Sequence, residues 1–276
     1  MRKIKLFALL AFCVTLLALA PVAAADPPVG DDPDPGPLPP GLSLRVFVHY
    51  PKGQGPAIDR DSMPACSDSS ASGCDDYSIA TTNGHQIHWK NPTGIPYYVT
   101  LNYNAKKSPL LKQSDPLSAI QAAFATWESA SDAGLSYTYK GTLDKASLGG
   151  RMDGKNVVGW KPIQGTAIAI TYVWYYTSTG EIAEFDMAFN NTLPWSYTPP
   201  TGIDQTTPYD DPDNPGVAGT YDLRDIATHE AGHTLMLNDL YASSDQNLTM
   251  YGYGATAELK KDTLGLGDDL GVKAIY

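Results

Sequence analysis

The chain has 276 residues, 42% of them hydrophobic, and its 30 Asp and Glu outnumber 19 Lys and Arg to give a formal net charge of −11. A chain of this length can bury one well-packed core. The acidic balance argues against a nucleic-acid partner, because neutralising phosphates requires clustered Lys and Arg.

Residues 1–25 are predicted to be a secretory signal peptide. Three cations at positions 2, 3 and 5 precede an apolar run from Leu6 to Ala20, and the small residues at 23–25 provide a cleavage site. An apolar run of about 15 residues is shorter than a membrane span requires. We therefore expect a secreted, extracellular product without stable membrane insertion.

The next two segments differ in composition. Residues 26–41 are almost wholly Pro, Asp and Gly and cannot bury enough apolar surface to fold, so a disordered linker is expected. Residues 42–94 form either an N-terminal extension packed on the following domain or a removable pro-segment, and positions 42–50 alternate in the manner of a strand. Cys66 and Cys74 lie in this segment, and in an exported protein a local disulfide is the simplest interpretation.

From residue 95 onward the pattern is that of an α+β domain. The run Tyr97–Tyr103 is rich in β-forming residues. A helix is predicted to start at Ser114-Asp115-Pro116, since Pro is favoured in the first turn. One face of this helix is predicted to lie in the core, and it carries Leu117, Ile120, Phe124 and Trp127. Further strands are predicted at 135–139, 165–174 and 182–189.

Residues 229–233 read His-Glu-Ala-Gly-His, after a good helix N-cap at Asp222. On a helix, His229 and His233 lie on one face about one turn apart. Two imidazoles and the adjacent Glu230 are what a catalytic zinc needs, namely two ligands and a general base for its water. Asp239 lies six residues past His233 and could supply a third ligand if the chain turns back, leaving a fourth position to water.

The spacing His229-Glu230-x-x-His233-x5-Asp239 resembles the metzincin zinc signature, with an acidic third ligand in place of the more usual His. The segment 248–251 resembles the Met-turn of that clan, with Met250 beneath the metal. The segment 268–276 is similar to the closing helix of the matrixin branch. The resemblance covers roughly residues 95–276 and indicates a matrixin-like zinc metallopeptidase.

This resemblance implies an α+β catalytic domain with a twisted, mostly parallel sheet, an active-site helix and a C-terminal helix. It also implies that the strand at Thr166–Thr171 forms the upper edge of the cleft, where an extended polypeptide substrate could pair as an added strand. One departure is Met236, which stands where the family has a Gly that breaks the helix. Because Gly adopts positive φ without a Cβ clash, Met236 predicts strain or a differently shaped turn.

Three alternatives remain open on the sequence. Glu258-Leu-Lys-Lys-Asp262 has the spacing of the second helix of thermolysin-like gluzincins, which would make Glu258 the third ligand. The chain could also be a non-catalytic, zinc-bearing module that binds peptides. A cysteine of the 42–94 segment could instead ligate the zinc and hold the enzyme latent, although the matrixin Pro-Arg-Cys-Gly motif is absent.

The function expected from these residues is that of a secreted zinc endopeptidase, a hydrolase in which Glu230 is the general base. Its partners would be extended polypeptide substrates, and a monomer is expected. Calcium is a second candidate ion, because 25 of the 30 acids are Asp. The candidates for binding it precede the zinc helix, where solvated turn acids are the alternative interpretation; they are Asp210, Asp211 and Asp213.

Overall fold

The computed structural model describes four stretches of the chain, which are residues 38–55, 66–130, 134–199 and 216–276. Three predicted features lie outside these stretches: the signal peptide 1–25, the linker positions 26–37, and the acidic residues Asp210, Asp211 and Asp213.

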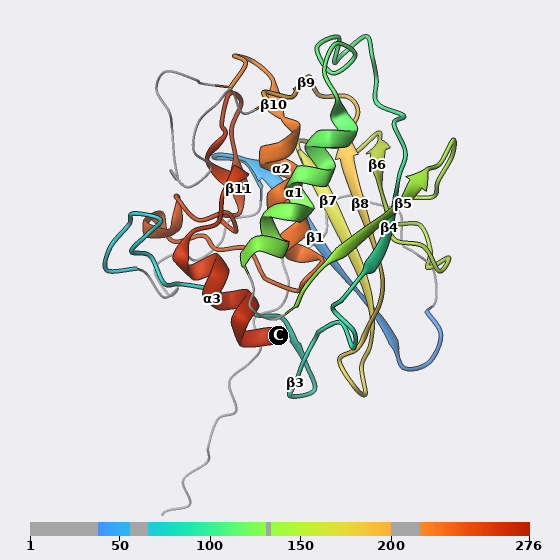
Figure 1. The fold of residues 1–276 in the computed structure, drawn as a ribbon, viewed down its shortest axis with the longest axis vertical. Helices are drawn as coiled ribbons and strands as arrows, with labels where there is room; N and C mark the ends of the chain where they lie inside the picture. The colour runs from blue at the N-terminus through green and yellow to red at the C-terminus, as the bar shows by residue number, and fades with distance from the viewer. Residues whose placement is uncertain (1–37, 56–65, 131–133, 200–215) are drawn as a thin grey trace, which may run out of the picture.

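A mostly parallel sheet forms the centre of the fold (Figure 1). Its strands are β1 (Leu42–Pro51), β4 (Ile95–Val99), β5 (Tyr137–Thr142), β6 (Val157–Lys161), β7 (Ala169–Tyr176), β8 (Ile182–Asn190) and β11 (Tyr253–Gly254). Within the described stretches these seven strands lie in the order β11-β1-β7-β8-β6-β4-β5. Only β7 runs antiparallel to its neighbours among these pairings, and the mixed α+β class with a mostly parallel sheet is therefore confirmed.

Two helices cover one face of this sheet, and a third lies near the C-terminus (Figure 1). They are α1 (Pro116–Ala130), α2 (Leu223–His233) and α3 (Leu266–Ile275). As predicted, α1 begins at Pro116, where Asp115 accepts a hydrogen bond from the Ser118 backbone N–H, and Phe124 and Trp127 are buried. In the part of the chain that the structure describes, no helix is both long and apolar enough to cross a membrane.

Short elements complete the fold. The strands β2 (Thr81–Thr82) and β3 (His85–Gln86) pair with each other, as do β9 (Trp195–Ser196) and β10 (Tyr221–Asp222). Single 3-10 turns are η2 (Ser243–Asp245) and η3 (Lys260–Asp262). The pairing of β10 with β9 fixes the start of α2, because α2 follows β10 directly.

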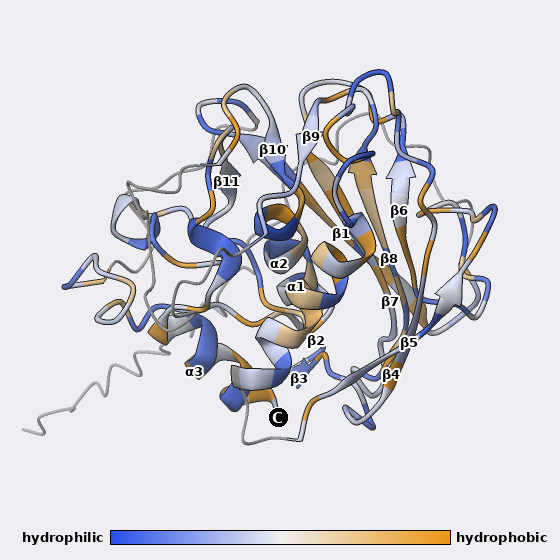
Figure 2. Ribbon diagram, turned by 45° about the horizontal axis from the view of Figure 1, so that its top comes forward, coloured by the Kyte–Doolittle hydropathy of each residue, from blue (hydrophilic) through white to orange (hydrophobic). Residues whose placement is uncertain are grey.

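The strands β7 and β8 are buried on both faces, and Figure 2 shows hydrophobic segments of both in the middle of the sheet. Val173 and Phe185 pack in the core under the helices, whereas Tyr172 and Trp174 pack in a second cluster on the other side. That second side also carries a buried acid, Asp186, which accepts hydrogen bonds from the backbone N–H groups of residues 149 and 157. Burial raises the pKa of Asp186 to about 8.

The expectation of an edge strand at Thr166–Thr171 is wrong. The strand is β7, Ala169–Tyr176, and it lies between β8 and β1. Strand β1 pairs with it antiparallel, from Leu42 opposite Tyr176 to His49 opposite Ala169. The physical reason is that the alternating apolar side chains of β1 pack against those of β7 in the second cluster. Strand β1 is therefore part of the central sheet and covers this edge of β7.

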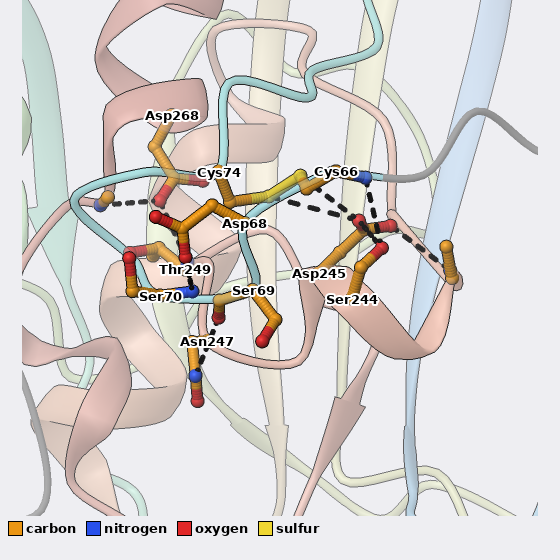
Figure 3. The surroundings of a disulfide bond; sticks show 12 residues. Cys66, Asp68, Ser69, Ser70, Cys74, Ser244, Asp245, Asn247, Thr249 and Asp268 are labelled. Carbon is orange, nitrogen blue, oxygen red and sulfur yellow. Dashed lines mark hydrogen bonds between the residues drawn. A yellow bond between two sulfur atoms is a disulfide. The ribbon is translucent and has the colours of Figure 1, made fainter.

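Cys66 and Cys74 form a disulfide in the structure, as the sequence predicted (Figure 3). The Cys66 backbone N–H donates to the Ser244 hydroxyl at 3.1 Å. The Gly267 backbone N–H donates to the Cys74 carbonyl at 2.9 Å, at the first turn of α3. The disulfide loop therefore contacts the C-terminal part of the chain, on the side where α3 begins.

Candidate metal centre

The helix α2 carries the first two predicted ligands and is buried along its whole length. It starts where predicted, because the Asp222 side chain accepts hydrogen bonds from the backbone N–H groups of Arg224 and Asp225. It ends at His233, before the reversal that a third ligand at Asp239 requires. The N-cap and the buried faces fix the direction of this helix. His229 and His233 therefore lie on one face and point toward the same position.

The turn that follows α2 shows the strain that Met236 predicted, rather than a different shape. Met236 has φ of +69°, in the left-handed region that normally favours Gly. Its N–H donates to the His233 carbonyl at 2.9 Å, and the Leu237 N–H donates to the Gly232 carbonyl at 3.2 Å. These are the two hydrogen bonds of a Schellman cap, in which the residue at C′ is usually Gly. The Met236 side chain is fully buried in the core, which offsets part of the backbone cost.

This reversal brings Asp239 back to the two histidines. The Nε2 atoms of His229 and His233 are 3.1 Å apart. Oδ1 of Asp239 lies 3.1 Å from the first and 3.5 Å from the second. Bonds of about 2.0–2.1 Å to a tetrahedral zinc would place neighbouring ligand atoms about 3.3–3.4 Å apart. The three separations are thus close to the edge lengths of a zinc tetrahedron.

The tautomers of both rings are set by backbone carbonyls. His229 Nδ1 lies 2.7 Å from the Thr249 carbonyl, and His233 Nδ1 lies 2.8 Å from the Leu237 carbonyl. Because a carbonyl only accepts, each Nδ1 of a neutral ring carries the proton and each Nε2 presents a lone pair. Oδ1 of Asp239 then has no donor, and no hydrogen-bond partner is found for it. Three lone pairs facing one another are stable only around a cation, so the donor set fits a divalent metal.

The surroundings shift the pKa of each of the three side chains. Burial is the main cause that lowers the pKa of His229 to about 4, so its ring is neutral at neutral pH. Burial alone would raise the pKa of Asp239, but the adjacent rings of His233 and His229 hold it well below its ordinary value. Asp239 in turn raises the pKa of His233 against the effect of burial, so zinc competes with a proton at this ring. A neutral imidazole and an ionised carboxylate are the forms that bind zinc.

Glu230 lies beside the donors and faces strand β7. Its Oε2 accepts a hydrogen bond from the Thr171 hydroxyl at 2.5 Å, and its Oε1 is buried with no partner. Burial raises the pKa of Glu230 to about 7. Thr171 therefore orients the carboxyl group while one oxygen stays available to bind or accept a proton.

The predicted Met-turn lies under α2. A Cβ placed on Gly232 would be 2.3 Å from Met250 Sδ, so this sulfur packs directly against the helix between the two histidines. The Asp268 carboxylate accepts from the backbone N–H groups of Thr249 and Met250 at 2.8 and 3.0 Å. Since the Thr249 carbonyl binds His229, Asp268 at the start of α3 helps to position the first ligand.

The rival ligand Glu258 is placed elsewhere. Its carboxylate pairs with Lys260 at 2.7 Å and accepts from the Ala255 N–H, and it belongs to none of the candidate metal groups in the described stretches. The structure brings together His229, His233 and Asp239 instead.

Sequence reasoning missed three residues of the site. His49 on β1 lies against His229, with ring centroids 3.9 Å apart, and forms a second candidate group with His229 and Glu230. Thr171 binds Glu230, and buried Lys261 donates to the Thr249 carbonyl at 3.3 Å. Only His49 had a usable signal, because it shares a face of an alternating strand with Phe47.

Comparison with known protein families finds no family model that matches this chain, and comparison with curated proteins finds no matching relative.

Proposed function

We propose that the chain is a secreted zinc-dependent endopeptidase of metzincin type. The observation that carries the proposal is the convergence of three metal-binding side chains, those of His229, His233 and Asp239, beside the partnerless Oε1 of Glu230. Two imidazoles and one carboxylate at tetrahedral separations favour zinc over calcium or magnesium, which prefer sets of oxygen ligands.

Zinc, when bound, makes its water a nucleophile near neutral pH and polarises the scissile carbonyl. Glu230 accepts the proton of the attacking water and then donates it to the leaving amine. Thr171 holds Oε2 at 2.5 Å, which leaves Oε1 to exchange that proton. The carbonyls that bind both Nδ1 atoms keep the two rings from rotating during these steps.

The substrates proposed are polypeptides, because two imidazoles and a carboxylate beside the general base Glu230 form the donor set of a zinc peptidase. Strand β7 is paired on both sides, so an extended chain could pair with it only after β1 has left. All the site residues come from one chain, which favours action as a monomer. The signal-like residues 1–25 support secretion.

The test compares the wild-type chain with Glu230→Gln by metal analysis and by long incubations with casein, with and without a chelator. Both proteins are expected to bind one zinc, while cleavage by the variant falls about 10²- to 10⁴-fold, since general base catalysis contributes about that much. Cleavage that persists in zinc-loaded Glu230→Gln would contradict the proposal. Zinc binding without any cleavage by the wild-type chain would favour the peptide-binding module instead.

A further inference from the structure

Lys261 is fully buried, although a lysine usually keeps its charged end in water. It lies in η3, and its backbone N–H donates to the Asp225 carboxylate in the first turn of α2 at 2.7 Å. Its Nζ donates to the carbonyls of Tyr251 at 2.6 Å and of Thr249 at 3.3 Å. An apolar side chain of similar length would avoid the cost of burying this group, so the lysine indicates a role beyond packing.

One of these two carbonyls also orients a metal-binding residue. The Thr249 carbonyl accepts from His229 Nδ1 at 2.7 Å as well as from Lys261 Nζ. A carbonyl oxygen has two lone pairs, so these two donors use both of them. On the other side of the residue, the Thr249 N–H donates to the Asp268 carboxylate at 2.8 Å. Lys261 and Asp268 thus hold from both ends the residue that fixes the His229 ring.

The other carbonyl lies in the segment that pairs beside the third predicted ligand. Tyr251 forms a parallel bridge with Leu240, which directly follows Asp239. The Leu240 N–H donates to the carbonyl before Tyr251 at 2.9 Å, and the Leu240 carbonyl accepts from the N–H after Tyr251 at 2.8 Å. The hydrogen bond from Lys261 therefore fixes the short backbone segment against which the chain at Asp239 is paired.

We infer that Lys261 is a positioning residue of the metal centre, which keeps His229 and Asp239 at the separation that a single ion requires. The inference rests on the proposed function, because it assumes a metal at this site. The side chain acts through the backbone of residues 249–251, and its anchor at Asp225 ties that segment to the helix that carries both histidines.

Removal of the Lys261 side chain has two effects of opposite sign on zinc affinity. The loss of a nearby positive charge favours binding of a divalent cation. The loss of two hydrogen bonds to the ligand-bearing segments disfavours it, and outer-shell groups of this kind contribute about 10- to 100-fold in metal affinity. If Lys261 acts by positioning, the second effect is the larger one. The sign of the change in affinity therefore tests the inference.

The first test measures zinc affinity by chelator competition in Lys261→Met and in the matched control Lys260→Met. The control removes the same group one residue away, where it pairs with Glu258. We expect Lys261→Met to bind zinc at least about tenfold more weakly than the wild type, and Lys260→Met to match the wild type. Equal or tighter binding by Lys261→Met would overturn the inference and leave the metal centre intact. A wild-type chain that binds no zinc would overturn both.

A second measurement separates positioning from a general loss of structure. His233 is the internal control, because its Nδ1 lies against the carbonyl of Leu237 and not that of Thr249. In zinc-loaded Lys261→Met, the NMR signal of the His229 Nδ1–H group should shift from its wild-type position, while that of His233 should stay. Shifts of equal size in both rings would overturn the inference.

The third measurement uses the unsubstituted chain, so it remains valid if the variant does not fold. A bound cation makes the Nδ1–H group of His229 a stronger donor to the shared Thr249 carbonyl. Zinc should therefore shift the side-chain NMR signal of Lys261 and leave that of Lys260 unchanged. A shift at His229 without one at Lys261 would contradict the inference alone, and no shift at either residue would contradict the proposed function as well.

Discussion

Gly232 stands between the two histidines of α2, and its replacement by Ala probes how tightly the metal centre is packed. A Cβ there would lie 2.3 Å from Met250 Sδ and 2.6 Å from Cζ2 of Trp127. The Trp127 ring cannot move freely, since it is fully buried and its Nε1 donates to the Thr228 carbonyl at 2.7 Å. The helix must therefore shift away from both side chains, and the ligands on either side of Gly232 shift with it.

Two effects of opposite sign decide the magnitude. Ala is favoured over Gly inside a helix by about 1 kcal/mol. An extra methyl group in a packed core costs about 1–3 kcal/mol through displaced side chains and backbone. Both contacts of the new Cβ are far shorter than van der Waals distance, so the cost lies in the upper part of that range. We expect Gly232→Ala to lower the free energy of unfolding by about 1–2 kcal/mol.

Urea unfolding of the zinc-free chain measures this change, and chelator competition measures the accompanying loss of zinc affinity. Combining Gly232→Ala with Met250→Ala removes one of the two clashing groups, so the pair should show a coupling energy of about 0.5–3 kcal/mol. A Gly232→Ala protein that is about 1 kcal/mol more stable than wild type, with unchanged zinc affinity, would show only the helix-propensity term. That result would refute the packing described here.

Three further predictions concern stability. The pKa of Asp186 is raised from 3.8 to about 8 in the folded chain. Between these two pH values the folded chain keeps a proton on Asp186 that the unfolded chain loses. The contribution of this group to the free energy of unfolding is therefore fully present at low pH and is lost as the pH rises toward 8. Asp186→Asn should thus flatten the pH dependence of urea unfolding between pH 5 and 8 by up to about 1.4 kcal/mol per pH unit, and an unchanged slope would contradict this. Asp268→Ala should lower the free energy of unfolding by about 3 kcal/mol or more in the same assay, because three buried backbone N–H groups lose their acceptor. The variant should also bind zinc more weakly. A decrease in the free energy of unfolding below about 1 kcal/mol would refute the role assigned to this carboxylate. Replacing Cys66 and Cys74 together by Ser opens a loop of eight residues and should cost about 2.5 kcal/mol, measured as a shift in the urea midpoint, whereas an unshifted midpoint would mean that the disulfide does not constrain the unfolded chain.

The parts of the site that could be predicted depend on local rules. The cap at Asp222 set the start of α2, and the i, i+4 spacing placed His229 and His233 on one face. Strain in the turn at Met236 could be predicted, because this chain has no Gly where the helix reverses. Asp239 could then be expected to reach the two histidines, because it follows His233 by six residues and the chain reverses between them.

The parts that could not be predicted depend on contacts between distant segments. Alternation in Leu42–Pro51 predicted a strand but gave no indication of its partner, so β7 was wrongly expected at an edge. His49 is 180 residues from His229. The face that it shares with Phe47 indicates that it points inward, but no local pattern identifies the ring that it contacts. The register between β1 and β7 is set by side chains packing on both faces of the sheet, which only the folded chain brings together.

The central claim is that one zinc binds at His229, His233 and Asp239, and zinc-edge anomalous diffraction from crystals of the zinc-loaded chain tests it most directly. We predict one strong peak about 2.0–2.2 Å from both Nε2 atoms and from an Asp239 carboxylate oxygen. A peak at Glu258, or no peak within bonding distance of the two histidines, would contradict the claim.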